Sequence, residues 1–174
     1  MYKRQFVYWA GTHASLLPEV VLKECYVDAV LRGEAECNLY EFYQWRIGKI
    51  KADNVRGLCY KKNGEVIISP LPPLVELSQL GYHPFELLDI KKYVDKPVVK
   101  RKNYIPGKIL PFMTSKGCVK KCAFCYNTVV NNSKWRPYSL TSVYREMDFL
   151  IENYGITGWM FYDDNIFVDP ERAW

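Results

Sequence analysis

The chain has 174 residues, which is enough to bury one hydrophobic core, or one domain and part of a second. Its 49% hydrophobic and 16% aromatic residues exclude an intrinsically disordered protein. The formal charge of +5 comes from scattered Lys and Arg residues, so a nucleic-acid partner is not expected. No apolar run is long enough to span a membrane and no export signal is recognisable, so we expect a cytoplasmic protein.

Short strands and helices alternate through the first part of the chain. β-prone residues at 6–10 precede a glycine turn and a helix expected over 16–23, where Pro18 suits the first helical turn. A second short strand is expected at 29–31, and the apolar spacing over 37–47 is typical of an amphipathic helix. This βαβα order predicts a parallel sheet in an α/β domain.

A hairpin and a proline-rich stretch follow. Two β-prone runs between 55 and 68 flank Asn63-Gly64, and an Asn-Gly pair is the strongest short-range signal for a β-hairpin. Seven of the ten prolines then fall between Ser69 and Pro111, where no sustained periodicity occurs. We therefore expect a linker in this stretch.

A strand, a helix and a second strand are expected after the prolines, over 108–114, 140–154 and 158–162. Ser139 or Thr141 is expected to cap the helix. The expected parts of the chain are a domain over 1–68, a linker over 69–107 and a βα unit over 108–174.

Three cysteines, Cys118, Cys122 and Cys125, lie at intervals of four and three residues in the loop after the strand expected at 108–114. Thiolates this close suit an iron-sulfur cluster, and three ligands would leave one iron open to a substrate. Structural zinc is the main alternative, but it usually needs four ligands. A buried helix face is a second alternative, which Gly117 and the lysines of the loop disfavour. The other cysteines, Cys25, Cys37 and Cys59, have no assigned role.

With its CxxxCxxC spacing, segment 109–174 resembles the radical S-adenosylmethionine (SAM) enzymes. The resemblance implies a partial (β/α) barrel in which the three cysteines bind a [4Fe–4S] cluster and SAM chelates the open iron. One electron from a donor such as flavodoxin or ferredoxin would cleave SAM to a 5′-deoxyadenosyl radical. Phe124 is expected to pack beside the adenine, and Tyr126 is a further candidate contact.

Two acidic residues end the second expected strand of this unit, in the sequence Met160-Phe161-Tyr162-Asp163-Asp164-Asn165. The segment resembles one found in cobalamin-linked radical SAM enzymes. The resemblance implies that Asp163 or Asp164 accepts a hydrogen bond from the SAM amino group. An acidic cap on the next helix is the alternative interpretation.

The segment from Ala10 to Glu19, with the later segment from Val27 to Glu34, resembles the closing portion of a cobalamin-binding domain. The resemblance implies the C-terminal part of a doubly wound, Rossmann-like fold. Gly11 would approach the nucleotide tail of the corrinoid, a position that needs a residue without a side chain. The cobalt-ligating DxHxxG motif of the family is missing, so His13 is interpreted as structural.

The two resemblances, in this order, predict a cobalamin-dependent radical SAM enzyme that performs methyl transfer, ring formation or rearrangement on an unknown substrate. No catalytic residue is identified. A tRNA methylthiotransferase-like radical SAM enzyme and a zinc-dependent nucleic-acid-binding module are the alternatives. Both domains are expected to be truncated, so we expect the isolated chain to be inactive.

Overall fold

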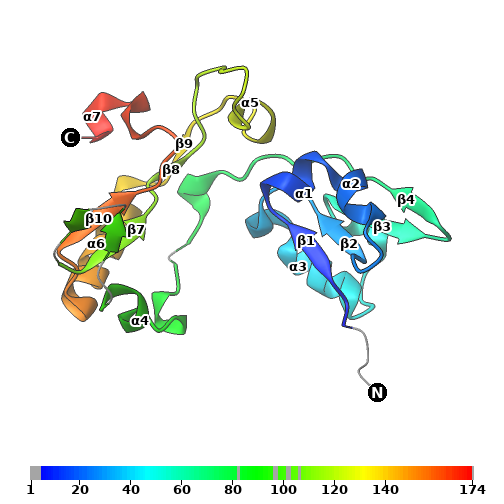
Figure 1. The fold of residues 1–174 in the computed structure, drawn as a ribbon, viewed down its shortest axis with the longest axis horizontal. Coiled ribbons are helices and arrows are strands. Elements are labelled where there is room, and N and C mark those ends of the chain that lie inside the picture. The colour runs from blue at the N-terminus through cyan, green and yellow to red at the C-terminus, as the bar shows by residue number, and fades with distance from the viewer. Residues whose placement is uncertain (1–4, 82, 96–97, 101–102, 106, 174) are drawn as a thin grey trace. The chain divides into compact units, whose positions relative to one another are not determined.

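The computed structural model describes residues 5–81, 83–95, 98–100, 103–105 and 107–173. It has two units (Figure 1). The amino-terminal unit contains Met1–Val75 and Lys121–Asn132, and the carboxy-terminal unit contains Glu76–Lys120 and Ser133–Trp174. The expected linker over 69–107 is thus divided between the two units, and the expected domain bounds stay predictions.

The amino-terminal unit has a four-stranded sheet in the order β1-β2-β3-β4. The strands are β1 (Tyr8–Ala10), β2 (Ala29–Leu31), β3 (Leu58–Lys62) and β4 (Glu65–Ile67). The predicted parallel pairing is found between β1 and β2, and the predicted hairpin forms β3 and β4. β3 pairs with β2 in the antiparallel direction, so the sheet is mixed.

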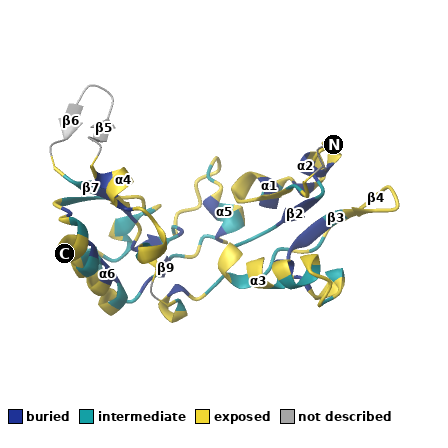
Figure 2. Cartoon of the chain, turned by 90° about the horizontal axis from the view of Figure 1, so that it is seen from below, coloured by how far each residue is buried: buried dark blue, intermediate teal, exposed yellow. Residues whose placement is uncertain are grey.

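Helices cover both faces of this sheet, as in a doubly wound fold (Figure 2). Val30 of β2 belongs to the core cluster that contains Ala14 of α1 and Leu22 of α2, whereas its neighbours Ala29 and Leu31 belong to the other cluster. This alternation follows from the two-residue repeat of a strand. The helices of this unit are α1 (Thr12–Leu16), α2 (Pro18–Lys23), α3 (Ala35–Arg46), α5 (Asn127–Val130) and the 3-10 turn η1 (Ala52–Asn54).

The helix expected over 16–23 is found as α2, Pro18–Lys23, and a separate helix, α1, occupies Thr12–Leu16, where the sequence predicts a turn. Leu17 separates the two helices. Leu17 has φ −126° and ψ 53°, outside the helical region. The ring of a proline disfavours the helical conformation in the residue before it, which explains the break. Pro18 itself occupies the first turn of α2, as predicted.

The carboxy-terminal unit contains the predicted strand, helix and strand. β7 (Ile109–Phe112) and β10 (Gly158–Phe161) are parallel neighbours, and α6 (Leu140–Tyr154) connects them. Ser139 caps α6 through its side chain, and Gly155 ends the helix with φ 67°, a left-handed conformation that glycine adopts without strain.

Shorter elements complete the carboxy-terminal unit: η2 (Leu77–Gln79), η3 (Phe85–Leu87), α4 (Lys91–Val94), β5 (Val98–Lys100), β6 (Asn103–Ile105), β8 (Ser115–Lys116), β9 (Arg136–Pro137), η4 (Ile166–Val168) and α7 (Pro170–Ala173). β5 pairs with β6, and β8 pairs with β9. Within the part of the chain that the structure describes, no helix has the length and apolar character needed to cross a membrane.

Candidate cluster and cofactor site

The ends of β7 and β10 bring two distant segments together. Phe112, the last residue of β7, is paired in register with Phe161, the last residue of β10. Because the two strands are parallel, the residues that follow them leave the sheet at the same edge. The cysteine loop begins at this edge, and the predicted acidic residues lie beside it.

Asp163 binds the start of the cysteine loop. Its Oδ1 accepts hydrogen bonds from the hydroxyls of Thr114, at 2.8 Å, and Ser115, at 2.5 Å. Its Oδ2 lies 3.1 Å from the backbone nitrogen of Thr114, which also donates. Thr114 and Ser115 are both buried. Asp163 therefore satisfies polar groups that would otherwise be buried without partners.

Asp164 contacts the residue just before the first cysteine. The backbone nitrogen of Gly117 donates to Oδ2 of Asp164 at 2.8 Å. Gly117 has φ 87°, in the left-handed region that favours glycine, and it turns the chain into Cys118. Two successive carboxylates thus hold two successive points of the loop.

The Cys118 sulfur accepts two hydrogen bonds. The donors are the backbone nitrogen of Lys120, at 3.4 Å, and Nδ2 of Asn165, at 3.8 Å. Thiolate ligands of iron-sulfur clusters commonly receive such N–H donors, so the surroundings of Cys118 suit a cluster ligand.

Cys122 and Cys125 belong to the amino-terminal unit. The backbone nitrogen of Cys125 donates to the Cys122 carbonyl at 3.0 Å, and the Thr128 hydroxyl donates to the Cys125 carbonyl at 2.8 Å. This turn leads into α5, which packs against α1 of the same unit. Cys122 is exposed and Cys125 is half-buried.

The two aromatic candidates of the loop are accessible. Phe124 is 93% exposed, which is unusual for a phenylalanine and leaves its ring open to a ligand. Tyr126 starts α5, and its carbonyl accepts the backbone N–H of Val130 at 2.9 Å. Their predicted contacts with SAM stay predictions.

The three loop cysteines are free thiols. In the described ranges, no three His, Cys, Asp or Glu side chains are placed together so as to hold a metal ion. Cys118 lies in one unit and its two partners in the other. The predicted ligand set therefore depends on the chemistry and spacing of the thiols, and these fit an iron-sulfur cluster.

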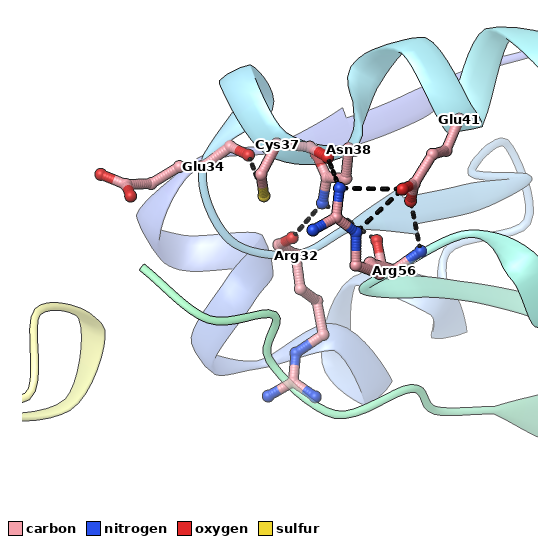
Figure 3. A network of polar contacts seen from close by, with 6 residues as sticks. All are labelled: Arg32, Glu34, Cys37, Asn38, Glu41 and Arg56. Carbon is pink, nitrogen blue, oxygen red and sulfur yellow. Dashed lines mark hydrogen bonds and ion pairs between the residues drawn. The ribbon is translucent and has the colours of Figure 1, made fainter. Parts of the chain in front are cut away.

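The remaining cysteines differ from those of the loop. Burial raises the pKa of the Cys37 and Cys59 thiols, so both are held in the neutral form. Figure 3 shows Cys37 beside a polar network. In this network Asn38 donates to the carbonyls of Arg32, at 2.7 Å, and Arg56, at 3.0 Å. Cys59 is buried in the core, whereas Cys37 is half-buried.

The backbone conformation of the turn before α1 requires glycine at position 11. Gly11 has φ 90°, so any other residue would be strained there, and no atom lies within 4 Å of the point that a Cβ would occupy. The backbone nitrogen of Ser15 donates to its carbonyl at 2.9 Å, which closes the first turn of α1. The predicted contact of Gly11 with a corrinoid stays a prediction.

No protein-family model matches the sequence. The chain is 31% identical over 170 residues, 97% of its length, to an uncharacterized methyltransferase of Pyrococcus horikoshii. It is 26% identical to the cytidylyl-2-hydroxyethylphosphonate methyltransferase of Streptomyces wedmorensis, in an alignment of 185 residues that includes 94% of this chain. A putative methylthiotransferase of Methanocaldococcus jannaschii is 32% identical over 120 residues, 68% of the chain and 22% of that protein.

The fold also resembles solved structures. It superposes on the cobalamin-dependent SAM radical enzyme OxsB, solved with aqua-cobalamin and SAM bound, with a TM-score of 0.67 and 19% sequence identity. The match covers 91% of this chain and 21% of OxsB. The chain is a relative of these methyltransferases, and it shares the fold of part of OxsB. It spans about a third of the length of the two methyltransferases, 35% of each.

The structure brings together Asp163, Asp164 and the start of the cysteine loop, all of which the sequence singled out. The contact between Asn165 and Cys118 was missed by sequence reasoning. The available signal was the position of Asn165, directly after the two acidic residues.

Sequence reasoning also missed Arg32, which joins the two segments that resemble a cobalamin-binding domain. Nε of Arg32 donates to the Ser15 carbonyl at 2.9 Å, and the backbone nitrogen of Gly33 donates to the Ser15 hydroxyl at 3.0 Å. The helix that follows the glycine turn is therefore tied to the segment after β2.

Proposed function

We propose that this chain is part of a cobalamin-dependent radical SAM enzyme, in which Cys118, Cys122 and Cys125 bind a [4Fe–4S] cluster. The single observation that carries the proposal is the anchoring of the CxxxCxxC loop by Asp163 and Asp164 at the carboxyl end of a parallel strand pair. The chemistry supplied by the cofactors, once bound, is one-electron cleavage of SAM to a 5′-deoxyadenosyl radical.

The chain's own residues would position these cofactors. The exposed ring of Phe124 is available to stack on the adenine, with Tyr126 as a second aromatic contact. Asp163 or Asp164 would accept a hydrogen bond from the SAM amino group in addition to its contacts in the loop. Gly11 would let the corrinoid approach the backbone of its turn.

The proposed reaction is methyl transfer, with ring formation or rearrangement as the other outcome. The sequence similarity to the two methyltransferases supports methyl transfer. The substrate is unknown and is either a small molecule or a macromolecule. The electron would come from a one-electron donor such as flavodoxin or ferredoxin.

Anaerobic reconstitution with iron and sulfide tests the cluster. We expect a [4Fe–4S] absorption and, after reduction, an electron paramagnetic resonance (EPR) signal that changes when SAM is added, because an open iron must respond to its chelator. Each of Cys118→Ala, Cys122→Ala and Cys125→Ala should abolish the signal. The matched control is Cys25→Ala, since Cys25 is exposed and lies outside the loop.

Two results would contradict this proposal. One is cluster assembly that survives the three loop substitutions. The other is stoichiometric zinc in the natively purified protein, which would favour the zinc-dependent binding module.

A methylthiotransferase-like enzyme is the second candidate, supported by the similarity to the putative methylthiotransferase. Such an enzyme would carry a further cluster on three other cysteines. The position of Cys59, which is buried in the core of the amino-terminal unit, disfavours it as a cluster ligand. Iron that persists in a chain lacking all three loop cysteines would favour the second candidate.

A further inference from the structure

Three consecutive residues, which follow β10 after Tyr162, contact successive points of the cysteine loop. Asp163 binds the residues just after β7, Asp164 binds the backbone before Cys118, and Asn165 lies against the Cys118 sulfur. The two segments run side by side because β7 and β10 are parallel and in register. Asn165 is thus the member of the set that reaches a predicted cluster ligand.

A second contact fixes the orientation of the Asn165 amide. Its Oδ1 accepts the backbone N–H of Phe167 at 3.1 Å, as the cap of η4. With the oxygen engaged there, the NH₂ group is the part of the amide that faces Cys118, and Nδ2 lies 3.8 Å from the sulfur. The contact is therefore a donor contact and cannot be reversed without loss of the cap.

We propose that Asn165 is a positioning residue for the Cys118 sulfur, which it holds by an N–H···S hydrogen bond when the thiolate binds iron. The inference rests on the proposed function, since it requires a cluster at Cys118. An N–H donor withdraws electron density from the thiolate and so stabilises the more negative, reduced cluster. Asn165 therefore raises the reduction potential of the cluster, together with the backbone N–H of Lys120.

Two uncharged substitutions test the hydrogen bond to the sulfur separately from the cap of η4. In Asn165→Ser the hydroxyl is able to accept the Phe167 N–H, but it is too short to reach the sulfur. Asn165→Leu removes both contacts at similar size. The matched control is Asn153→Ser at an exposed position of α6, where the amide donates to the Phe149 carbonyl at 2.8 Å.

The chain of 174 residues is reconstituted anaerobically with iron and sulfide and titrated with dithionite, and the cluster is followed by EPR. We expect wild-type iron content in both Asn165 variants and a shift of the midpoint potential to more negative values. The Asn153→Ser control should keep the wild-type potential. If circular dichroism shows that the Asn165→Leu chain fails to fold, the midpoint potential of the Asn165→Ser chain alone tests the inference.

The two proposals fail in different ways. A wild-type potential in a folded, cluster-bearing Asn165→Ser chain would overturn the inference and leave the proposed function standing. A wild-type chain that assembles no [4Fe–4S] cluster would overturn the proposed function and this inference with it.

Discussion

Single side chains hold the predicted cofactor segments in place. In the amino-terminal unit, half-buried Arg32 donates to the carbonyl of Ser15 in α1 and to the carbonyl of Ser69. Gly33 lies against Pro72, where an added Cβ would come within 2.5 Å of the ring. One arginine and one glycine therefore connect the Gly11 turn to the proline-rich segment.

Arg32→Met should destabilise the amino-terminal unit. The substitution keeps much of the aliphatic stem but leaves the Ser15 and Ser69 carbonyls without their charged donor, at a cost of about 1–3 kcal/mol. Urea unfolding followed by circular dichroism measures the change. Lys62→Met is the control, because Lys62 is exposed at the end of β3 and should change little. Equal stability of the two variants would show that Arg32 has no clamping role.

At the scale of elements, α6 contacts the segment that precedes η3 in the carboxy-terminal unit. Glu146 is buried on α6, and its carboxylate accepts hydrogen bonds from the backbone nitrogen of His83, at 3.1 Å, and from Nδ1 of His83, at 2.9 Å. The ring of His83 also packs edge-on against Tyr138. The segment before η3 is therefore fastened to the helix.

Glu146→Ala should lower the thermal stability of the carboxy-terminal unit. The backbone N–H of His83 loses its acceptor, which we expect to cost about 1–3 kcal/mol. Differential scanning calorimetry measures the shift. Glu152→Ala on the exposed face of the same helix tests whether loss of a helical glutamate alone has this effect. A shift of the same size in both variants would contradict the fastening role.

At the scale of the whole molecule, the chain contains one four-stranded sheet and, in the other unit, a single parallel strand pair, among the residues that the structure describes. SAM and cobalamin, the cofactors of the proposed function, are large. An enzyme that excludes water from radical chemistry has to enclose such cofactors on several sides. The chain spans 35% of the length of the Pyrococcus horikoshii relative.

We accordingly expect the chain alone to assemble the cluster but to cleave SAM poorly and to bind cobalamin weakly. Liquid chromatography of 5′-deoxyadenosine and titration with hydroxocobalamin measure the two properties. A form lengthened to match the methyltransferase relatives should gain both. Tight corrinoid binding by these 174 residues would contradict the expectation.

The sequence by itself determined the elements whose signals are local. The helix over Leu140–Tyr154 matches its apolar periodicity, β2 falls on Ala29–Leu31 as expected, and the Asn-Gly pair forms the hairpin turn. The cysteine spacing likewise predicts an iron-sulfur cluster, and this stays a prediction. Each of these signals depends on residues a few positions apart, so the sequence alone is enough to detect it.

Only the tertiary structure decided which residues meet across the chain. The contact of Asn165 with Cys118 joins residues 47 positions apart, and that of Asp163 with Thr114 joins residues 49 positions apart. Such contacts depend on the register of β7 with β10, which is set by packing rather than by local periodicity. The antiparallel pairing of β3 with β2 was not predictable from the sequence for the same reason, because the direction of a strand is decided by long-range pairing.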